Sequence, residues 1–258
     1  MCALESGLVH AQAAPPDLRP PDRLTLSGNG SSLTGTDGGY GGSVNWTHYF
    51  TPNAIAGIGA EHQEIAESRF SFGSLRGSWG RGQSSSRFTL YGEVHYGSGD
   101  DDGRDFDYEV EVLGISQSLT RQLSVQLETR QIDIDTTRGN LPKIGFTYVW
   151  SPRWMTTFGY ANSISGNVNT ELFTGRLDHY GQYFNFVLGG ASGQADPVVI
   201  NQPGLNLPSQ TLKEGFAGIG KSFSRGEIQL IGDYLQLADS EKVTVTLTFT
   251  AYMGGSAR

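Results

Sequence analysis

Cysteine is almost absent from the chain: Cys2 is the only one among 258 residues, which excludes a disulfide framework and a cysteine-based zinc site. Charged residues are also scarce, at 17% against about 25% in an average protein, and the net charge of −8 argues against nucleic acid as a partner. No stretch approaches the ~18 continuous apolar residues of a membrane helix, which excludes a helical membrane protein. A membrane β-barrel is not excluded, because its strands alternate apolar and polar residues.

The chain is instead rich in glycine, with 36 residues, and from Arg23 onward apolar and polar residues alternate with a period of two. The clearest example is Val243 to Ala251, where the apolar side chains share one face and the threonines share the other. The same alternation recurs at Val44–Phe50, Phe88–His95, Phe106–Val112, Leu123–Glu128 and Lys143–Trp150. Such runs, broken by turn residues, predict transmembrane β-strands.

The links between these runs predict the topology. Some are tight turns: Thr51–Asn53, Gly82–Ser85, Thr120–Gln122, Ser151–Arg153, Tyr180–Gln182 and Ser224–Gly226. The others are mostly longer and more polar: Thr34–Gly39, Ala66–Arg69, Gly97–Asp105, Asp135–Leu141, Ser163–Thr170, Ala195–Gln210 and Ala238–Glu241. Together they predict an all-β, antiparallel, up-and-down transmembrane β-barrel of about 14 strands, with about 12 as the alternative count.

Loop length also predicts the orientation, because short turns face the periplasm and long polar loops face outward in bacterial barrels. We therefore expect Thr51–Asn53, Thr120–Gln122 and Ser151–Arg153 on the periplasmic side. Gly97–Asp105 and Ala195–Gln210 are expected on the outer side. The second of these loops contains three prolines and several apolar residues, so we expect it to fold over or into the barrel mouth as a lid.

Three segments are expected along the chain: a leader at 1–22, the barrel at 23–253 and a short tail at 254–258. Ala11-Gln12-Ala13 has the small-x-small form of a signal-peptidase site, which predicts cleavage near 13/14. A charged and an apolar region do not precede it, so the leader is interpreted as a truncated signal peptide of an exported protein. The proline-rich stretch Ala14–Asp22 is expected to be extended and unpacked.

Aromatic residues gather near the tight turns, as the interfacial girdle of a membrane barrel requires. The predicted membrane-interface aromatics are Trp46, Phe50, Trp79, Trp150, Trp154 and Phe223. The alternative is a secreted β-sandwich or carbohydrate-binding module, which also has many short strands. A sandwich would place tryptophan in its core rather than at one rim.

Two tight-turn phrases, Ser118–Leu123 and Val149–Trp154, and the closing hairpin Glu227–Tyr252 resemble those of the YaiO family of outer-membrane β-barrels. They are similar also to barrel domains of exopolysaccharide exporters. The resemblance covers most of Arg23–Met253. It implies location in the outer membrane of a Gram-negative bacterium, contact with outer-membrane lipids and the barrel-assembly machinery, and polysaccharide or small solutes as cargo.

A lipid-facing Arg or Lys near mid-bilayer costs ~2–4 kcal/mol, so charged faces are expected to point into the lumen. The predicted lumen charge cluster is Glu93, His95, Asp107, Glu109, Glu111, Glu128, Arg130, Lys143, Arg176, Asp178 and Asp233. These residues form either a ladder of salt bridges that holds the barrel's shape or an eyelet that selects permeants by charge. A barrel of this width is expected to be water-filled or plugged by a loop.

The sequence favours a pore or export channel over an enzyme. His95, with Glu93 two residues away, is the one pair that fits acid–base chemistry, and no serine motif accompanies it. The acidic loop Gly97–Asp105 lacks the closing glutamate of a calcium site, so no metal or other cofactor is expected. The alternatives are a closed structural or surface barrel without transport, and an outer-membrane lipid or glycan hydrolase.

Overall fold

The structure is a computed structural model that describes residues 22–35, 38–65, 68–82, 87–196, 210–238 and 240–253. All regular secondary structure in these segments is β-strand, and none of them contains a helix long and apolar enough to cross a membrane. The strands are β1 (Asp22–Leu33), β2 (Gly39–Thr51), β3 (Ala54–Ile65), β4 (Ser68–Arg81), β5 (Phe88–Asp101), β6 (Arg104–Ser118), β7 (Leu123–Ile134), β8 (Thr137–Ser151), β9 (Trp154–Asn162), β10 (Ser165–Gly166), β11 (Glu171–Tyr180), β12 (Asn185–Ala195), β13 (Gln210–Phe223), β14 (Gly226–Gln236) and β15 (Glu241–Met253).

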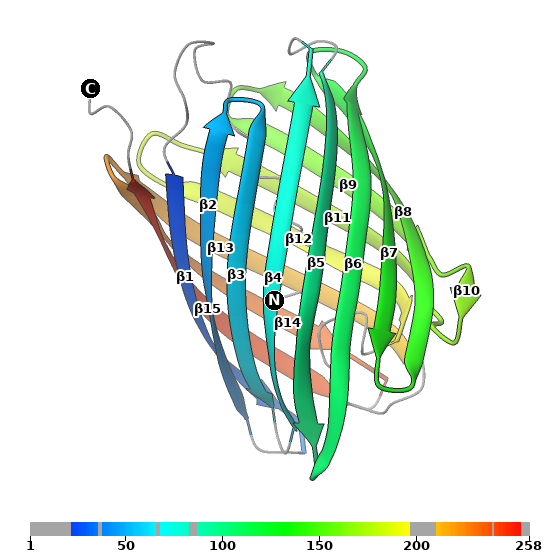
Figure 1. Cartoon of the computed structure of the whole chain (residues 1–258). Coiled ribbons are helices and arrows are strands. Elements are labelled where there is room, and N and C mark those ends of the chain that lie inside the picture. The colour runs from blue at the N-terminus through cyan, green and yellow to red at the C-terminus, as the bar shows by residue number, and fades with distance from the viewer. Residues whose placement is uncertain are drawn as a thin grey trace.

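The strands form one closed antiparallel barrel (Figure 1). Each long strand pairs with the long strands before and after it in sequence, which is the up-and-down arrangement. The two-residue β10 pairs with β8 beyond the end of the β8–β9 ladder. In the described part of the chain the wall therefore has fourteen long strands, which confirms the predicted fold class and strand count.

The barrel closes where the first and last strands meet. β1 and β15 pair without a break from Asp22 opposite Met253 to Leu33 opposite Lys242. Inside this seam the hydroxyls of Ser27 and Thr248 lie 3.0 Å apart. This ladder joins the first strand to the last, so neither β1 nor β15 is an open edge along it, as a barrel in lipid requires.

One rim of the barrel, here called the terminal rim, carries the start of β1, the end of β15 and the tight turns (Figure 1). In three of these turns the first hydroxyl accepts a hydrogen bond from the N–H two residues later. The pairs are Thr51 with Asn53 at 3.2 Å, Thr120 with Gln122 at 3.1 Å, and Ser151 with Arg153 at 3.3 Å. These side chains supply a backbone partner locally, which lets the chain reverse within a few residues.

The opposite rim differs from the prediction in two places. Gly97–Asp105 and Asp135–Leu141 are not loops, since strands run through most of both ranges and leave only two-residue turns at 102–103 and 135–136. Asp102, Gly103 and Asp135 have φ angles of 51°, 79° and 52°, the left-handed conformation that tight hairpin turns require. Their polar composition predicts loops, whereas the strands continue through both ranges with polar residues on their outer face.

The two faces of the wall differ in exposure. On β15, Val243, Val245 and Leu247 are each about half exposed, while Thr244 and Thr246 between them are buried. Alternate residues on a strand point to opposite faces, so the exposed set is the outside of the barrel and the buried set lines the inside. The outside of β15 is apolar along the strand, which suits contact with lipid.

β6 has the reverse pattern over its first half. Phe106, Tyr108, Val110 and Val112 are buried on the inside, and the alternating acids are exposed on the outside. The inward orientation predicted for Asp107, Glu109 and Glu111 is therefore wrong. The prediction assumed that the whole strand lies in lipid, but this half of β6 runs toward the rim opposite the terminal rim and exposes its charges there.

The predicted leader at 1–22, with its cleavage near 13/14, lies outside the described residues apart from Asp22, the first residue of β1. The tail at 254–258 and residues 197–209 of the expected lid also lie outside them. Within the described residues the first strand begins at Asp22 and the last ends at Met253, and the segment boundaries stay a prediction.

Candidate functional site: the inner wall

The centre of the inner wall carries a polar belt on β4, β5 and β7, made of Arg76, Tyr91, Glu93, Gln126, Glu128 and Arg130. Each points inward because it has the parity of the buried residues of its strand. The most buried members are Glu128 and Arg130, at 5% and 4% exposure. Charges this deep need partners, since an unpaired buried charge is costly.

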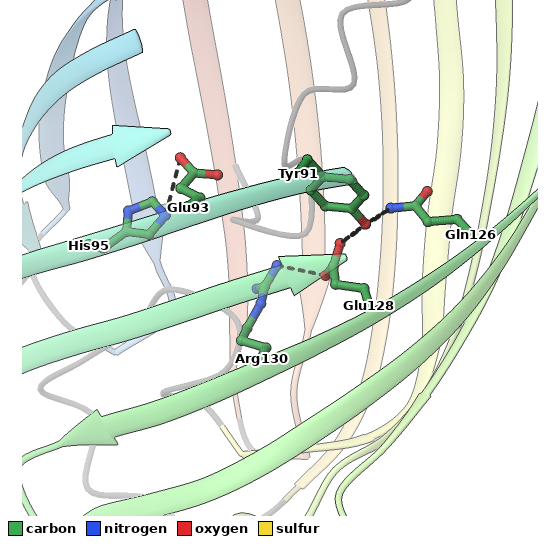
Figure 2. Close-up of polar contacts among 6 residues, drawn as sticks. All are labelled: Tyr91, Glu93, His95, Gln126, Glu128 and Arg130. Carbon is green, nitrogen blue, oxygen red and sulfur yellow. Dashed lines mark hydrogen bonds and ion pairs between the residues drawn. The ribbon is translucent and has the colours of Figure 1, made fainter. Parts of the chain in front are cut away.

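The partners come from two strands that are not adjacent. The phenol of Tyr91 on β5 donates a hydrogen bond to Glu128 Oε2 on β7 at 2.9 Å (Figure 2). Gln126 donates to the Tyr91 hydroxyl and, at 3.3 Å, to the same carboxylate oxygen. Arg130 Nη2 lies 3.4 Å from Glu128 Oε1. The network therefore lies along the wall and ties β5 to β7 across β6.

Glycine makes this crossing possible. A Cβ at Gly114 of β6 would lie 2.1 Å from Cζ of Tyr91, so only glycine lets the ring lie flat across β6. Arg76 uses the same device over β3, where a Cβ at Gly57 would lie 2.7 Å from its Nε. Its guanidinium then donates to Thr47 Oγ1 on β2 at 2.6 Å.

Glu93 and His95 form a second pair on β5. His95 Nε2 lies 3.3 Å from Glu93 Oε1, and the two side chains are 16% and 14% exposed (Figure 2). The imidazole meets the ring of Phe72 edge-on, with 5.3 Å between ring centroids. These described contacts supply no nucleophilic hydroxyl to His95, so the pair gives the hydrolase alternative no support.

The remaining predicted lumen charges also lie on the inner wall. Lys143 of β8 stands opposite Glu128 in the strand register. On β11, Arg176 holds Asp178 with two nitrogens, at distances of 2.7 to 2.9 Å, and Asp178 is 3% exposed. Asp233 of β14 faces inward between Ile231 and Leu235. Arg176 and Asp178 thus form a local ion pair within one strand. Whether the lumen charges act as a salt-bridge ladder or as a selective eyelet stays a prediction.

Sequence reasoning missed an apolar wall beside the polar belt, toward the rim opposite the terminal rim. Its buried members are Phe70, Phe72, Phe106, Tyr108, Val110, Val112, Ile132, Ile134 and Leu141. A smaller apolar cluster lines the facing strands at the same end: Leu172, Ala191, Ala195, Leu212, Leu235 and Leu237. The sequence signal for this wall is a change along each strand. In the half of a strand where the outward residues become charged, the inward residues become apolar.

Three aromatic rings give the apolar wall its shape. Phe72 stacks on Tyr108 with centroids 5.0 Å apart and an interplanar angle of 13°, and Phe70 lies 6.1 Å from Phe72. Gly97 of β5 stands between Phe72 and Tyr108 in the register and has no side chain to separate them. The polar belt and the apolar wall meet at His95.

The predicted interface aromatics Trp46, Phe50, Trp79, Trp150, Trp154 and Phe223 are all 40% or more exposed on the outer face. Phe50 and Trp150 stand at the irregularities of the β2–β3 and β8–β9 ladders, next to the tight turns. Bulges at barrel rims re-aim side chains, and here they accompany the two most exposed of these rings. Their contact with a membrane interface stays a prediction.

No family model matches the chain, and no curated protein matches it in sequence. Among solved structures it is similar to the CymD monoaromatic hydrocarbon channel, with a TM-score of 0.68, 11% identity and coverage of 96% of this chain and 92% of that chain. It is also similar to the Pseudomonas putida toluene transporter TodX, with a TM-score of 0.57, 9% identity and coverage of 93% and 90%. For the Acinetobacter baumannii outer membrane protein Omp33 the values are 0.54, 10%, 90% and 98%.

At these identities the similarity shows the fold alone. The chain has the barrel fold seen in outer-membrane channel proteins. The resemblance to the YaiO family stays a prediction.

Proposed function

We propose that this protein is an outer-membrane channel for small apolar or amphipathic compounds. The observation that carries the proposal is the apolar wall on β4 and β6 to β8, which faces the barrel interior at one end. An inner wall of this kind solvates an apolar solute. The fold similarity to CymD and TodX, which are named as a hydrocarbon channel and a toluene transporter, supports this choice.

The same wall disfavours the alternative cargo, a polysaccharide. Sugar hydroxyls that leave water need hydrogen-bond partners, and an unpaired hydroxyl in apolar surroundings costs roughly 1–3 kcal/mol. Side chains such as Val110, Ile132 and Leu141 offer none. An export channel for exopolysaccharide would be expected to carry hydroxyl and amide groups along its whole inner wall.

The outer face supports placement in the outer membrane of a Gram-negative bacterium, with its lipids as the surroundings. Apolar side chains such as Leu75, Leu230 and Leu247 are about half exposed there or more. A soluble protein rarely exposes apolar side chains so continuously, whereas lipid solvates them. The barrel-assembly machinery is the expected partner for insertion.

The test is uptake by cells that produce the protein, compared with cells that do not. We expect radiolabelled toluene to enter several times faster with the protein, and arabinose to enter at an unchanged rate. Faster arabinose uptake without a change for toluene would contradict the proposal and favour a general porin. No effect on either solute would favour the closed barrel.

A matched pair of variants ties the result to the apolar wall. Ile132 is 2% exposed on the inner face of β7, and its neighbour Gln131 is exposed on the outer face. Ile132→Gln should reduce toluene uptake, while Gln131→Asn should not. Both variants should first be shown to keep the resistance to SDS without boiling that marks a folded barrel.

A further inference from the structure

We infer that His95 is a specificity-determining residue that gives the channel a preference for hydroxylated aromatic compounds, such as phenols, over bare hydrocarbons. This inference rests on the proposed function and names a substrate class within it. The residue lies on the inner face of β5, where the polar belt meets the apolar wall. A solute with an aromatic body and a hydroxyl group matches both sides of that junction.

The apolar side of the junction suits the body of such a solute. The ring of Phe72 contacts His95 edge-on and stacks on Tyr108, which adds a second aromatic surface. Val110 stands opposite His95 in the strand register and is 6% exposed. These buried side chains make the surroundings of His95 on this side apolar and aromatic, which suits the planar ring of such a solute.

The polar side of the junction has one hydrogen-bonding atom without a partner among the described residues, Nδ1 of His95. Nε2 of His95 lies 3.3 Å from the Glu93 carboxylate, which can only accept, so this nitrogen carries a proton. The other ring nitrogen, Nδ1, is buried and has no hydrogen-bond partner among the described residues. Leaving a buried polar atom unpaired costs roughly 1–3 kcal/mol, so this atom is a site where a hydrogen-bonding ligand gains affinity.

The chemistry of Nδ1 selects a hydroxyl group. In the neutral imidazole, with the proton on Nε2, Nδ1 is an acceptor, and in the imidazolium it is a donor. A hydroxyl both donates and accepts, so it can pair with Nδ1 in either state. A methyl group at the same place, as in toluene, pairs in neither state and leaves Nδ1 unsatisfied.

The preference for hydroxylated aromatic compounds can be tested without transport, by measuring ligand binding to the purified full-length protein in detergent. We expect phenol to bind about three- to tenfold more tightly than toluene, the gain that one net hydrogen bond supplies. In His95→Phe, phenol and toluene should bind equally well, with toluene affinity retained. The matched control is His62→Phe, because His62 lies on the outer face and its Nδ1 is already paired with Ser71 Oγ at 2.7 Å.

A spectroscopic signal separates a direct role of His95 from a structural one. In a long-range proton–nitrogen NMR spectrum, the Nδ1 resonance of His95 should shift on addition of phenol and stay in place with toluene. Equal binding of both compounds to the wild-type protein would overturn the inference and leave the channel proposal standing. Absence of binding for both compounds would count against both proposals, and a preference that survives in His95→Phe would place the hydroxyl site elsewhere.

Discussion

β15 and β6 are both long strands of one barrel, yet they distribute polarity in opposite ways. β15 exposes Val243, Val245 and Leu247 on the outside and buries threonines inside, along the strand. β6 does so only near the terminal rim, where Leu113 and Ile115 are exposed. Over its other half, acids lie outside and Phe106 to Val112 line the inside.

This difference indicates where each strand leaves the lipid. A membrane strand is apolar outside because lipid surrounds it, whereas a strand in water is apolar on the side of the core. The half of β6 with exposed acids follows the rule for water. The wall at β6 is therefore expected to project beyond the membrane, and the β5–β6 hairpin extends far at the end opposite the terminal rim (Figure 1). The apolar wall is the inner side of this projecting part.

The largest expected effect is an all-or-none difference in labelling between the two rims. With Cys2→Ser as background, Asp102→Cys in the β5–β6 turn should react with an impermeant maleimide on intact cells. Asn53→Cys in the β2–β3 turn should react only after the outer membrane is permeabilised, because tight turns face the periplasm. Labelling at position 53 without labelling at 102 would reverse the orientation assigned to β6 and β15.

A buried charge on the inner side of β6 should have the next largest effect. Val110→Asp places an acid among apolar side chains, and the free energy of unfolding should fall by about 3–5 kcal/mol, as for other uncompensated buried charges. Glu111→Val, on the outer side of the same segment, should change it by less than about 0.5 kcal/mol. Denaturant titration in lipid vesicles measures both, and equal losses would show that the two faces of β6 do not differ as described.

A lysine on the outer face should reduce stability by different amounts on β15 and on β6. Leu247→Lys on β15 should reduce stability by about 2–4 kcal/mol, because the lysine would face lipid near mid-membrane. Glu109→Lys on β6 should reduce it by less than about 1 kcal/mol, because this position faces water. The same vesicle titration applies, and a loss at position 109 as large as that at 247 would place the acids of β6 in the membrane.

The smallest expected change in the free energy of unfolding concerns the polar belt on the inner wall. Tyr91→Phe removes the phenol that donates to Glu128, and a hydrogen bond to a buried charged group contributes about 1.5–3 kcal/mol. The control is Tyr96→Phe, because Tyr96 is 65% exposed on the outer face of the same strand. The unfolding midpoint of Tyr91→Phe should therefore be lower than that of Tyr96→Phe. Identical midpoints would mean that the hydrogen bond of Tyr91 adds no stability.

Period-two alternation and turn residues were sufficient to predict the fold. Val243–Ala251 indicated its strand and both faces correctly, because one face of that strand is uniformly apolar. Turns such as Ser151–Arg153 were found because a hydroxyl and a proline act locally. Local signals of this kind do not depend on the rest of the fold.

The inner wall was predicted only in part, because the polarity of the inward face depends on where the membrane ends along each strand. Glu93, Glu128 and Asp178 were placed inward correctly, since their strands are apolar on the outside at that height. Asp107 was placed wrongly, because alternation defines two faces without saying which faces water. The Tyr91–Glu128 bond could not be predicted either, since it joins strands separated by β6 and depends on the missing side chain of Gly114.

The seam between β1 and β15 has a kinetic consequence. Its partners, such as Ser27 and Thr248, are 221 residues apart, so the final ladder depends on contacts of very high sequence separation. Contacts of high sequence separation form slowly. Until β15 arrives, β1 and β14 each present an open edge that can pair with another chain. A chain that ends before β15 is therefore expected to aggregate rather than to settle as a smaller barrel.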